Sequence, residues 1–237
     1  MGKYKAVLWD IDNTLLSFDA SETAALARGF RDFGFGELTP QMLEHYKIIN
    51  RRHWEALERG EMNKEEVLVG RYVEFFTKEN LDVSKARAFN DEYQRNLGDT
   101  IVFEDYAQEL VSGLKGKVLQ FVCSNGTRTA QERKLKNSGL DRLFDAVFIS
   151  ETLGYEKPMP GFYDRMFELL EKEGIRVSRG ECLMVGDSLT SDMRGGNNAG
   201  IDDCWFNPSG APNTTEVKIQ YEIRSLREVP GILGIRL

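Results

Sequence analysis

The 237-residue chain has few of the residues and segments that mark several classes of protein. It contains only three cysteines and two histidines, too few for a zinc site of the Cys/His type. The cysteines are odd in number, lie far apart and stand in or beside apolar runs, so we expect reduced thiols in the core. No segment approaches the roughly 18 apolar residues of a membrane span, and the apolar run that ends at Asp10 is too short for a signal peptide. These absences predict a cytoplasmic protein that makes no contact with a membrane.

Positive charges are fewer than negative charges. The chain has 31 Lys and Arg against 38 Asp and Glu, and its formal net charge is -7. This balance argues against electrostatic binding of a nucleic acid polymer, and an anionic ligand would need a local device to overcome the repulsion. The length lies between one and two average domains, which favours one large domain or a core with an insert.

The order of the expected elements indicates such an insert. The apolar run of residues 5–10 predicts a buried strand. Residues 19–98 are helical in pattern throughout, and four consecutive helices without a strand predict a bundle-like unit. Helix starts are indicated by Asp19 with Glu22, Thr39 before Pro40, Asn63 with Glu66, and Ser84.

After Gly98 strands alternate with helices, which predicts a parallel sheet covered on both faces. Strands are expected at 117–123, 146–150, 182–185 and 204–206, with helices near 104–114, 129–137, 160–172 and 191–198. The predicted fold class is therefore α/β, a Rossmann-like parallel sheet core with an inserted all-helical cap domain. Residues 1–16 and 99–237 would form the core and residues 17–98 the cap.

Polar residues follow four of the expected strands, at the sheet edge where parallel α/β proteins bind ligands. The four segments are Asp10-Ile11-Asp12-Asn13-Thr14, Ser124-Asn125-Gly126, Lys157-Pro158 and Gly186-Asp187-Ser188, the last with Asp192 five residues beyond Asp187. Each segment alone is ordinary for a polar turn or a helix cap. Their placement after successive strands, in this order, makes independent coincidence improbable.

The ordered set resembles the haloacid dehalogenase (HAD) superfamily of phosphotransferases and hydrolases, over residues 5 to about 206. The helical insert directly after the first motif resembles the subfamily with a cap of the first type. Asn13 stands where many members have Gly, a departure that Asn tolerates because it adopts unusual backbone angles in turns.

The resemblance implies a role for each motif residue. Asp10 would attack phosphorus and Asp12 would act as general acid and then general base. Mg²⁺ would be held by the Asp10 carboxylate, the Asp12 backbone carbonyl and Asp187. Further roles follow for the remaining residues: Ser124 and the Asn125 backbone N–H would bind phosphate, Lys157 would neutralise its charge, and Asp192 would orient Lys157 or a metal-bound water in preference to binding Mg²⁺ directly.

The cap would decide which phosphate ester is accepted. Asn50 and Trp54, with Gly60 and Arg71 beyond them and Cys204-Trp205 at the last strand, resemble the bacterial HAD-type pyrimidine 5'-nucleotidases. Asn50 and Trp54 are therefore candidates for binding the substrate's base or sugar. Helix packing is the alternative for Trp54, and a solvated surface position is the expectation for His53.

The predicted activity is Mg²⁺-dependent hydrolysis of small phosphomonoesters, foremost nucleoside 5'-monophosphates. A phosphosugar phosphatase or a phosphoglucomutase-like phosphotransferase would share every core residue and stays open. A dehalogenase is disfavoured because its chemistry needs no acid at Asp12, and a catalytically idle binding protein because binding alone needs no second carboxylate. The expected partner is a small phosphorylated metabolite, and a monomer is favoured.

Overall fold

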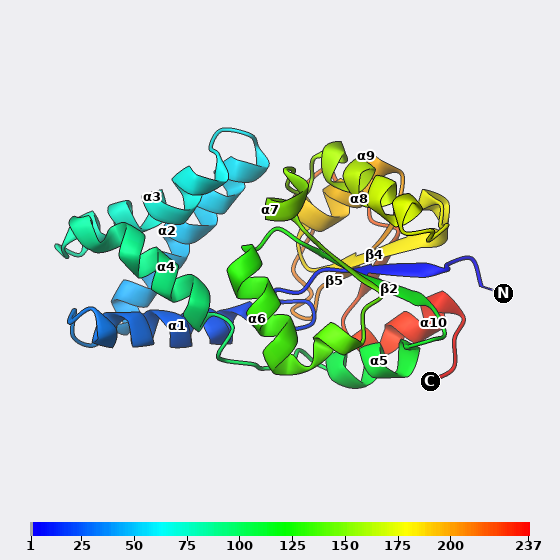
Figure 1. Cartoon of the computed structure of the whole chain (residues 1–237), viewed down its shortest axis with the longest axis horizontal. Helices are drawn as coiled ribbons and strands as arrows, with labels where there is room; N and C mark the ends of the chain where they lie inside the picture. The colour runs from blue at the N-terminus through cyan, green and yellow to red at the C-terminus, as the bar shows by residue number, and fades with distance from the viewer. Residues whose placement is uncertain (1) are drawn as a thin grey trace. The chain divides into compact units, whose positions relative to one another are not determined.

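A computed structural model describes residues 2–237. The chain divides into two compact units (Figure 1). The sheet unit comprises the chain up to Phe18 together with Ile101–Leu237, and the helical unit comprises Asp19–Thr100. Among the described residues, no helix combines the length and apolarity needed to cross a membrane.

The sheet unit is built on six parallel strands in the order β3-β2-β1-β4-β5-β6. Their bounds are β1 Ala6–Trp9, β2 Leu119–Ser124, β3 Ala146–Ile149, β4 Cys182–Gly186, β5 Asp202–Phe206 and β6 Tyr221–Ile223. Strand β1 lies at the centre and all four of its residues are fully buried, which explains its unbroken apolar run. The sheet and the helical insertion between β1 and β2 confirm the predicted α/β class.

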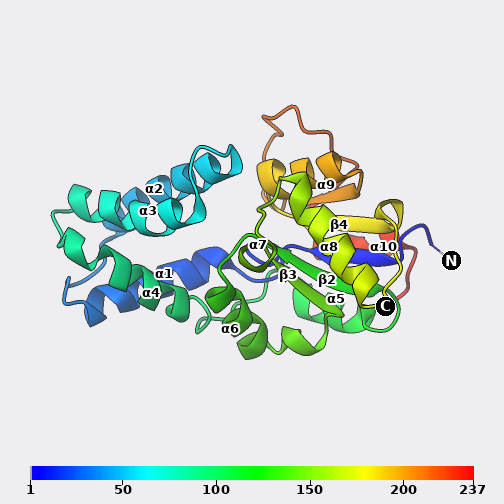
Figure 2. The same cartoon turned by 45° about the horizontal axis from the view of Figure 1, so that its top comes forward.

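Helices cover both faces of this sheet (Figures 1 and 2). On one face lie α5 (Ala107–Leu114), α6 (Arg128–Ser138) and α10 (Val229–Leu233), which pack on Val7 and Trp9 of β1. On the other lie α8 (Pro160–Lys172) and α9 (Arg194–Ala199), which pack on Ala6 and Leu8. The three cysteines, Cys123, Cys182 and Cys204, are buried and free, as predicted.

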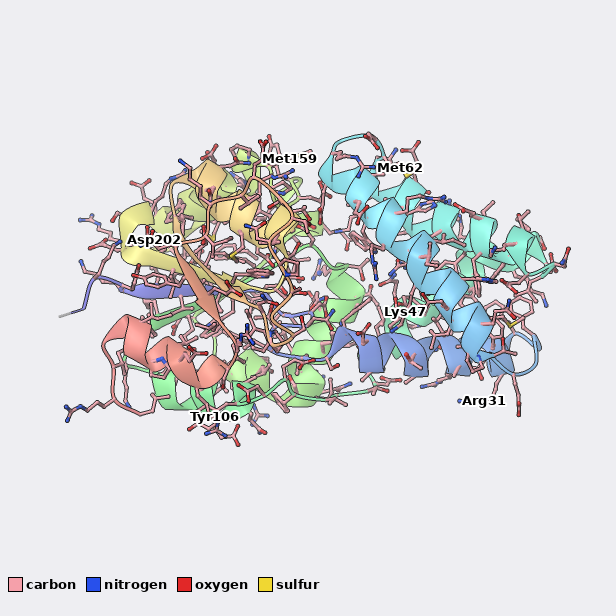
Figure 3. All side chains as sticks on the ribbon, turned by 180° about the vertical axis from the view of Figure 1, so that it is seen from behind. Arg31, Lys47, Met62, Tyr106, Met159 and Asp202 are labelled. Atoms are coloured by element: carbon pink, nitrogen blue, oxygen red, sulfur yellow. The ribbon has the colours of Figure 1, made fainter. Side chains whose placement is uncertain are left out.

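The helical unit is formed by α1 (Phe18–Asp32), which begins at the last residue of the sheet unit, and by α2 (Pro40–Glu58), α3 (Lys64–Lys78) and α4 (Ala86–Asn96). Helix α3 packs against both α2 and α4, and Figure 3 labels Arg31 near the end of α1 and Met62 in the turn between α2 and α3. The core of this unit is aromatic. A Cβ on Gly29 would lie 2.7 Å from the Phe89 ring, so only glycine allows α1 to approach α4 this closely.

Of the four predicted helix starts, Thr39 and Asn63 are confirmed, Asp19 lies one residue inside α1, which begins at Phe18, and Ser84 is wrong. The Thr39 hydroxyl accepts from Met42 N–H, and Asn63 with Glu66 forms a capping box. Ser84 does not open the fourth helix, because the Asp82 side chain accepts from Ser84 N–H and caps a 3₁₀ turn that precedes α4.

The predicted helix near residues 191–198 is divided into a π-helical turn, Leu189–Met193, and α9. The short helix α7 (Ser150–Leu153), strand β6 and helix α10 were not predicted. Each of these three elements has five residues or fewer, too few to show a repeating pattern in the sequence.

Candidate active site

The ends of three adjacent strands create the candidate site. The register pairs Trp9 of β1 with Val122 of β2 and Val185 of β4. The three strands therefore end at nearly the same level, and Ser124 at the end of β2 meets Asp10 and Asp187, which follow β1 and β4, at one edge of the sheet. All of them belong to the sheet unit.

Lys157 lies at the centre of the polar contacts. Its ammonium donates to Asp10 Oδ1 at 2.9 Å, to Asp192 Oδ1 at 2.6 Å and to the Cys123 carbonyl at 2.6 Å. The three acceptors use all three of its donors. Burial acts to lower the pKa of Lys157, but the two carboxylates hold that pKa well above its ordinary value. The two carboxylates therefore favour the charged form of this buried side chain.

The single charge of Lys157 does not balance the negative charge of the carboxylates around it. Burial raises the pKa of Asp10 to about 7, against the opposing effect of Lys157. Burial, together with the charges of Asp10 and Asp192, raises the pKa of Asp187 well above its usual range. A divalent cation is the ordinary means of keeping such a group of carboxylates ionised.

The donor set fits a hard divalent cation. Ligand oxygens of Asp10, Asp187 and Asp192 all lie within 4.8 Å of one another, and carboxylate oxygens are the ligands that Mg²⁺, Ca²⁺ and Mn²⁺ prefer. Asp192 already accepts from Lys157 through Oδ1 and from Ser188 N–H through Oδ2 at 3.1 Å. Asp10 accepts from Lys157 through Oδ1 at 2.9 Å and from Thr14 Oγ1 through Oδ2 at 3.2 Å, so these contacts distinguish only Asp187 from the other two carboxylates.

Two residues outside the predicted set support the loop that carries Asp187. Trp205 of β5 donates its indole N–H to the Asp187 carbonyl at 2.8 Å. A Cβ on Gly186 would lie 2.3 Å from Asp192 Oδ2, so glycine is required where β4 passes that carboxylate. Sequence reasoning used the Cys204-Trp205 pair only for a resemblance and missed this contact.

Asp12 contacts a different element from Asp10. Lys134 of α6 forms an ion pair with Asp12 Oδ1, and Gln131 of the same helix donates to Oδ2 at 2.7 Å. Sequence reasoning missed both residues, which had the appearance of ordinary polar positions on a helix. With Lys134 included, four carboxylates (Asp10, Asp12, Asp187, Asp192) face two ammonium groups. When all are ionised, the two negative charges that remain equal the charge of one divalent cation.

Ser124 is the last residue of β2 and Asn125 follows it. The Ser124 hydroxyl oxygen accepts from Gly126 N–H at 3.0 Å, which fixes its position at the strand end. The Asn125 side chain donates to the Lys157 carbonyl and accepts from Lys157 N–H, each at 2.8 Å. It also donates to Ser191 Oγ at 3.2 Å. Asn125 therefore joins three loops, whereas the sequence had suggested only a role for its backbone N–H.

The cap candidates lie in the helical unit. Asn50 is 6% exposed, donates to Glu22 Oε1 at 3.0 Å and accepts from Arg71 Nη1 at 2.7 Å. Trp54 is half-buried. The expectation of a solvated His53 is wrong, because the ring packs beside Gly70 of α3 and bonds to Glu74, at 6% exposure.

Comparisons with known proteins give a family match, relatives and a solved structure of similar fold. A family model described as haloacid dehalogenase-like hydrolase matches residues 4–200. The HAD-hydrolase YfnB of Bacillus subtilis is 36% identical over 99% of this chain and 97% of its own. A crystal structure of YfnB bound to magnesium superposes with a TM-score of 0.90, at 35% identity, over 98% of this chain and 100% of that chain.

Two further relatives carry names that state a substrate class. The pyrimidine 5'-nucleotidase PynA of Streptococcus pneumoniae is 33% identical over 95% of this chain and 93% of its own. The pyrimidine 5'-nucleotidase YjjG of Escherichia coli is 27% identical over 98% of both chains.

Proposed function

Because the chain belongs to the haloacid dehalogenase-like hydrolases, we propose that it hydrolyses small phosphomonoesters through a phosphoryl group carried on Asp10. The observation that carries this proposal is the Lys157 ammonium shared by Asp10 and Asp192 beside Asp187. In this arrangement the buried Lys157 ammonium contacts the Asp10 carboxylate, and one Asp10 oxygen lies in the acidic cluster formed with Asp187 and Asp192. The arrangement suits a nucleophile that must receive a negatively charged phosphoryl group.

Magnesium is the metal we propose for the acidic cluster. Asp10, Asp187 and the Asp12 backbone carbonyl would hold it, and Asp192 would keep Lys157 in place. When bound, the ion supplies positive charge to the phosphate and reduces repulsion between the phosphate and the carboxylates. The magnesium-bound structure of the relative YfnB supports this choice.

The two chemical steps need only a few groups of this chain. In the first, an Asp10 oxygen forms a bond to phosphorus, the bond from phosphorus to the ester oxygen breaks, and Asp12 gives its proton to that oxygen. In the second, a water oxygen attacks phosphorus while Asp12 takes a proton back, and the Asp10 carboxylate is released with inorganic phosphate. Ser124 would donate to a phosphoryl oxygen, and Lys157, whose three donors are used by the protein, would neutralise the phosphoryl charge.

The substrate class we propose is nucleoside 5'-monophosphates. The relatives PynA and YjjG, which are named as pyrimidine 5'-nucleotidases, support it. Of the two cap candidates, half-buried Trp54 has surface with which to contact a base. Asn50 has both ends of its amide bonded inside the helical unit, and we assign it to holding Glu22 and Arg71 together.

A phosphomonoester panel, assayed with Mg²⁺ and with a chelator, tests the proposal. We expect Mg²⁺-dependent release of phosphate, fastest from pyrimidine nucleoside monophosphates. D10N should abolish turnover because an amide is a poor nucleophile, whereas D141N, at an exposed aspartate of the same unit, should retain it. Activity of D10N within about tenfold of wild type would contradict the covalent step. A preference for hexose phosphates over all nucleotides would be consistent with the proposed phosphatase activity but would refute the proposed nucleotidase activity.

A further inference from the structure

Helix α6 presents two buried polar side chains to Asp12. Gln131 and Lys134 are three residues apart and so lie on one face of the helix. Each is 1% exposed, although both are residues that ordinarily reach solvent. The Thr127 side chain accepts from Ala130 N–H and begins α6 three residues after Ser124, so the loop that carries Ser124 leads directly into the helix that contacts Asp12.

The burial of Lys134 depends on Asp12. The ammonium pairs with Asp12 Oδ1 and lies 5.0 Å from the centre of the Phe18 ring. Burying an ammonium is costly unless a carboxylate compensates it. The Lys134 side chain is 1% exposed while that of Asp12 is 25% exposed. The cation is therefore sealed inside the protein, and the carboxylate it holds remains open to solvent.

The contact from Gln131 to Asp12 leaves one end of a buried amide without a hydrogen bond, which packing alone would not favour. Its Nε2 donates to Asp12 Oδ2 at 2.7 Å, but its buried Oε1 has no hydrogen-bond partner among residues 2–237. A Cβ on Gly126 would lie 2.2 Å from Gln131 Nε2, so the backbone at residue 126 leaves room for this amide. A buried amide with one unsatisfied end is destabilising, which indicates that its position serves Asp12.

We propose that Lys134 and Gln131 are positioning residues for Asp12, an inference that rests on the proposed phosphatase function. One donor on each carboxylate oxygen fixes the side chain on the α6 side and keeps it from turning toward Asp10 and Lys157, where it would compete for the metal. The ionised carboxylate then stays where it can take a proton from the attacking water and, released from one donor, give that proton to the leaving oxygen of the next turnover. Loss of Lys134 frees this rotation and damages proton transfer more than phosphoryl binding.

The test uses K134M, with K136M as the matched control at an exposed lysine of the same helix. Uridine 5'-monophosphate has a poor leaving group and needs a proton, whereas 4-nitrophenyl phosphate does not. We expect K134M to lower kcat for the nucleotide about 10- to 100-fold with little change in KM. The rapid-quench burst with the aryl phosphate should persist, K134R should restore part of kcat, and K136M should match wild type.

A double-mutant cycle separates positioning from a structural role. In a D12N background, K134M should cause no further loss of kcat, because Lys134 acts only through Asp12. Equal losses on both substrates, or a further loss in the D12N background, would overturn the inference. If K134M does not fold, Q131L gives the same comparison, since it removes the second donor without exposing a cation.

The outcome also distinguishes this inference from the proposed function. Absence of Mg²⁺-dependent turnover by the wild-type protein on every phosphomonoester would refute both. The wild-type protein could instead show turnover whose rate depends on the leaving group. If D12N alters that dependence while K134M and Q131L both leave it unchanged, only the assignment of Lys134 and Gln131 is refuted.

Discussion

Replacing Asn50 by alanine distinguishes a packing role from a recognition role in the helical unit. The change removes a hydrogen bond to the Glu22 carboxylate, which is 2% exposed, and one from the Arg71 guanidinium, which is 1% exposed. Hydrogen bonds to charged groups contribute about 1.5–3 kcal/mol each. Since Arg71 keeps its bond to Asn90 and its ring contacts, we take the lower end for each and expect a loss of about 3 kcal/mol.

The assay is denaturant unfolding followed by circular dichroism, beside kcat/KM for a nucleotide and for 4-nitrophenyl phosphate. N50A should lower the free energy of unfolding and reduce kcat/KM for both substrates by the same factor, because the helical unit is weakened as a whole. Q41A, at an exposed position of the same helix, should change stability by less than about 0.5 kcal/mol. A stability loss under about 1 kcal/mol combined with a selective loss on the nucleotide would refute the packing role.

Three further changes probe the sheet unit. D12N should slow esters with poor leaving groups more than aryl phosphates, because only the former need a proton in the first step; equal losses without a burst, which would show that phosphoryl transfer to Asp10 is rate-limiting, would contradict this. W205F removes the donor to the Asp187 carbonyl and should raise the Mg²⁺ concentration for half-maximal activity by about tenfold; an unchanged value would mean that the indole contributes only packing. Burial raises the pKa of Asp203 to about 6 from an ordinary 3.8, so the folded protein binds this proton more tightly than the unfolded chain, and stability should fall as the pH rises from about 4 to 6. D203N should remove that part of the slope in pH-dependent unfolding, and a slope identical to wild type would place the titration elsewhere.

The parts of the fold that could be predicted are those whose burial leaves a pattern in the sequence. Strand β1 is buried on both faces and is therefore an unbroken apolar run. Motif residues at strand ends could be brought together because parallel strands share a carboxyl edge. Caps such as Thr39 could be placed because one local hydrogen bond defines them. Strand β6 could not, since three residues carry no periodicity.

The contacts that could not be predicted depend on tertiary packing of polar groups. Gln131 and Lys134 have the composition of a solvated helix face, and nothing in their spacing indicates that they are buried against Asp12. His53 appeared exposed for the same reason and is held by Glu74. Asn125 could be assigned a backbone role from its motif. Its side-chain bonds could not be predicted, because their partner Lys157 lies 32 residues away in the chain.

The insertion of the helical unit also bears on how the sheet forms. Strands β1 and β2 are neighbours, yet residues 10–118 separate them along the chain, and the insert of residues 19–100 is most of that length. Closing a flexible loop of about 80 residues costs roughly 4 kcal/mol of chain entropy beyond a constant. The helical unit can relieve part of this cost, since its contacts are internal and Arg28 near its start pairs with Asp99 near its end at 2.8 Å. Once these helices have packed, the two ends of the insert are already close, and the pairing of β1 with β2 becomes the closure of a short loop.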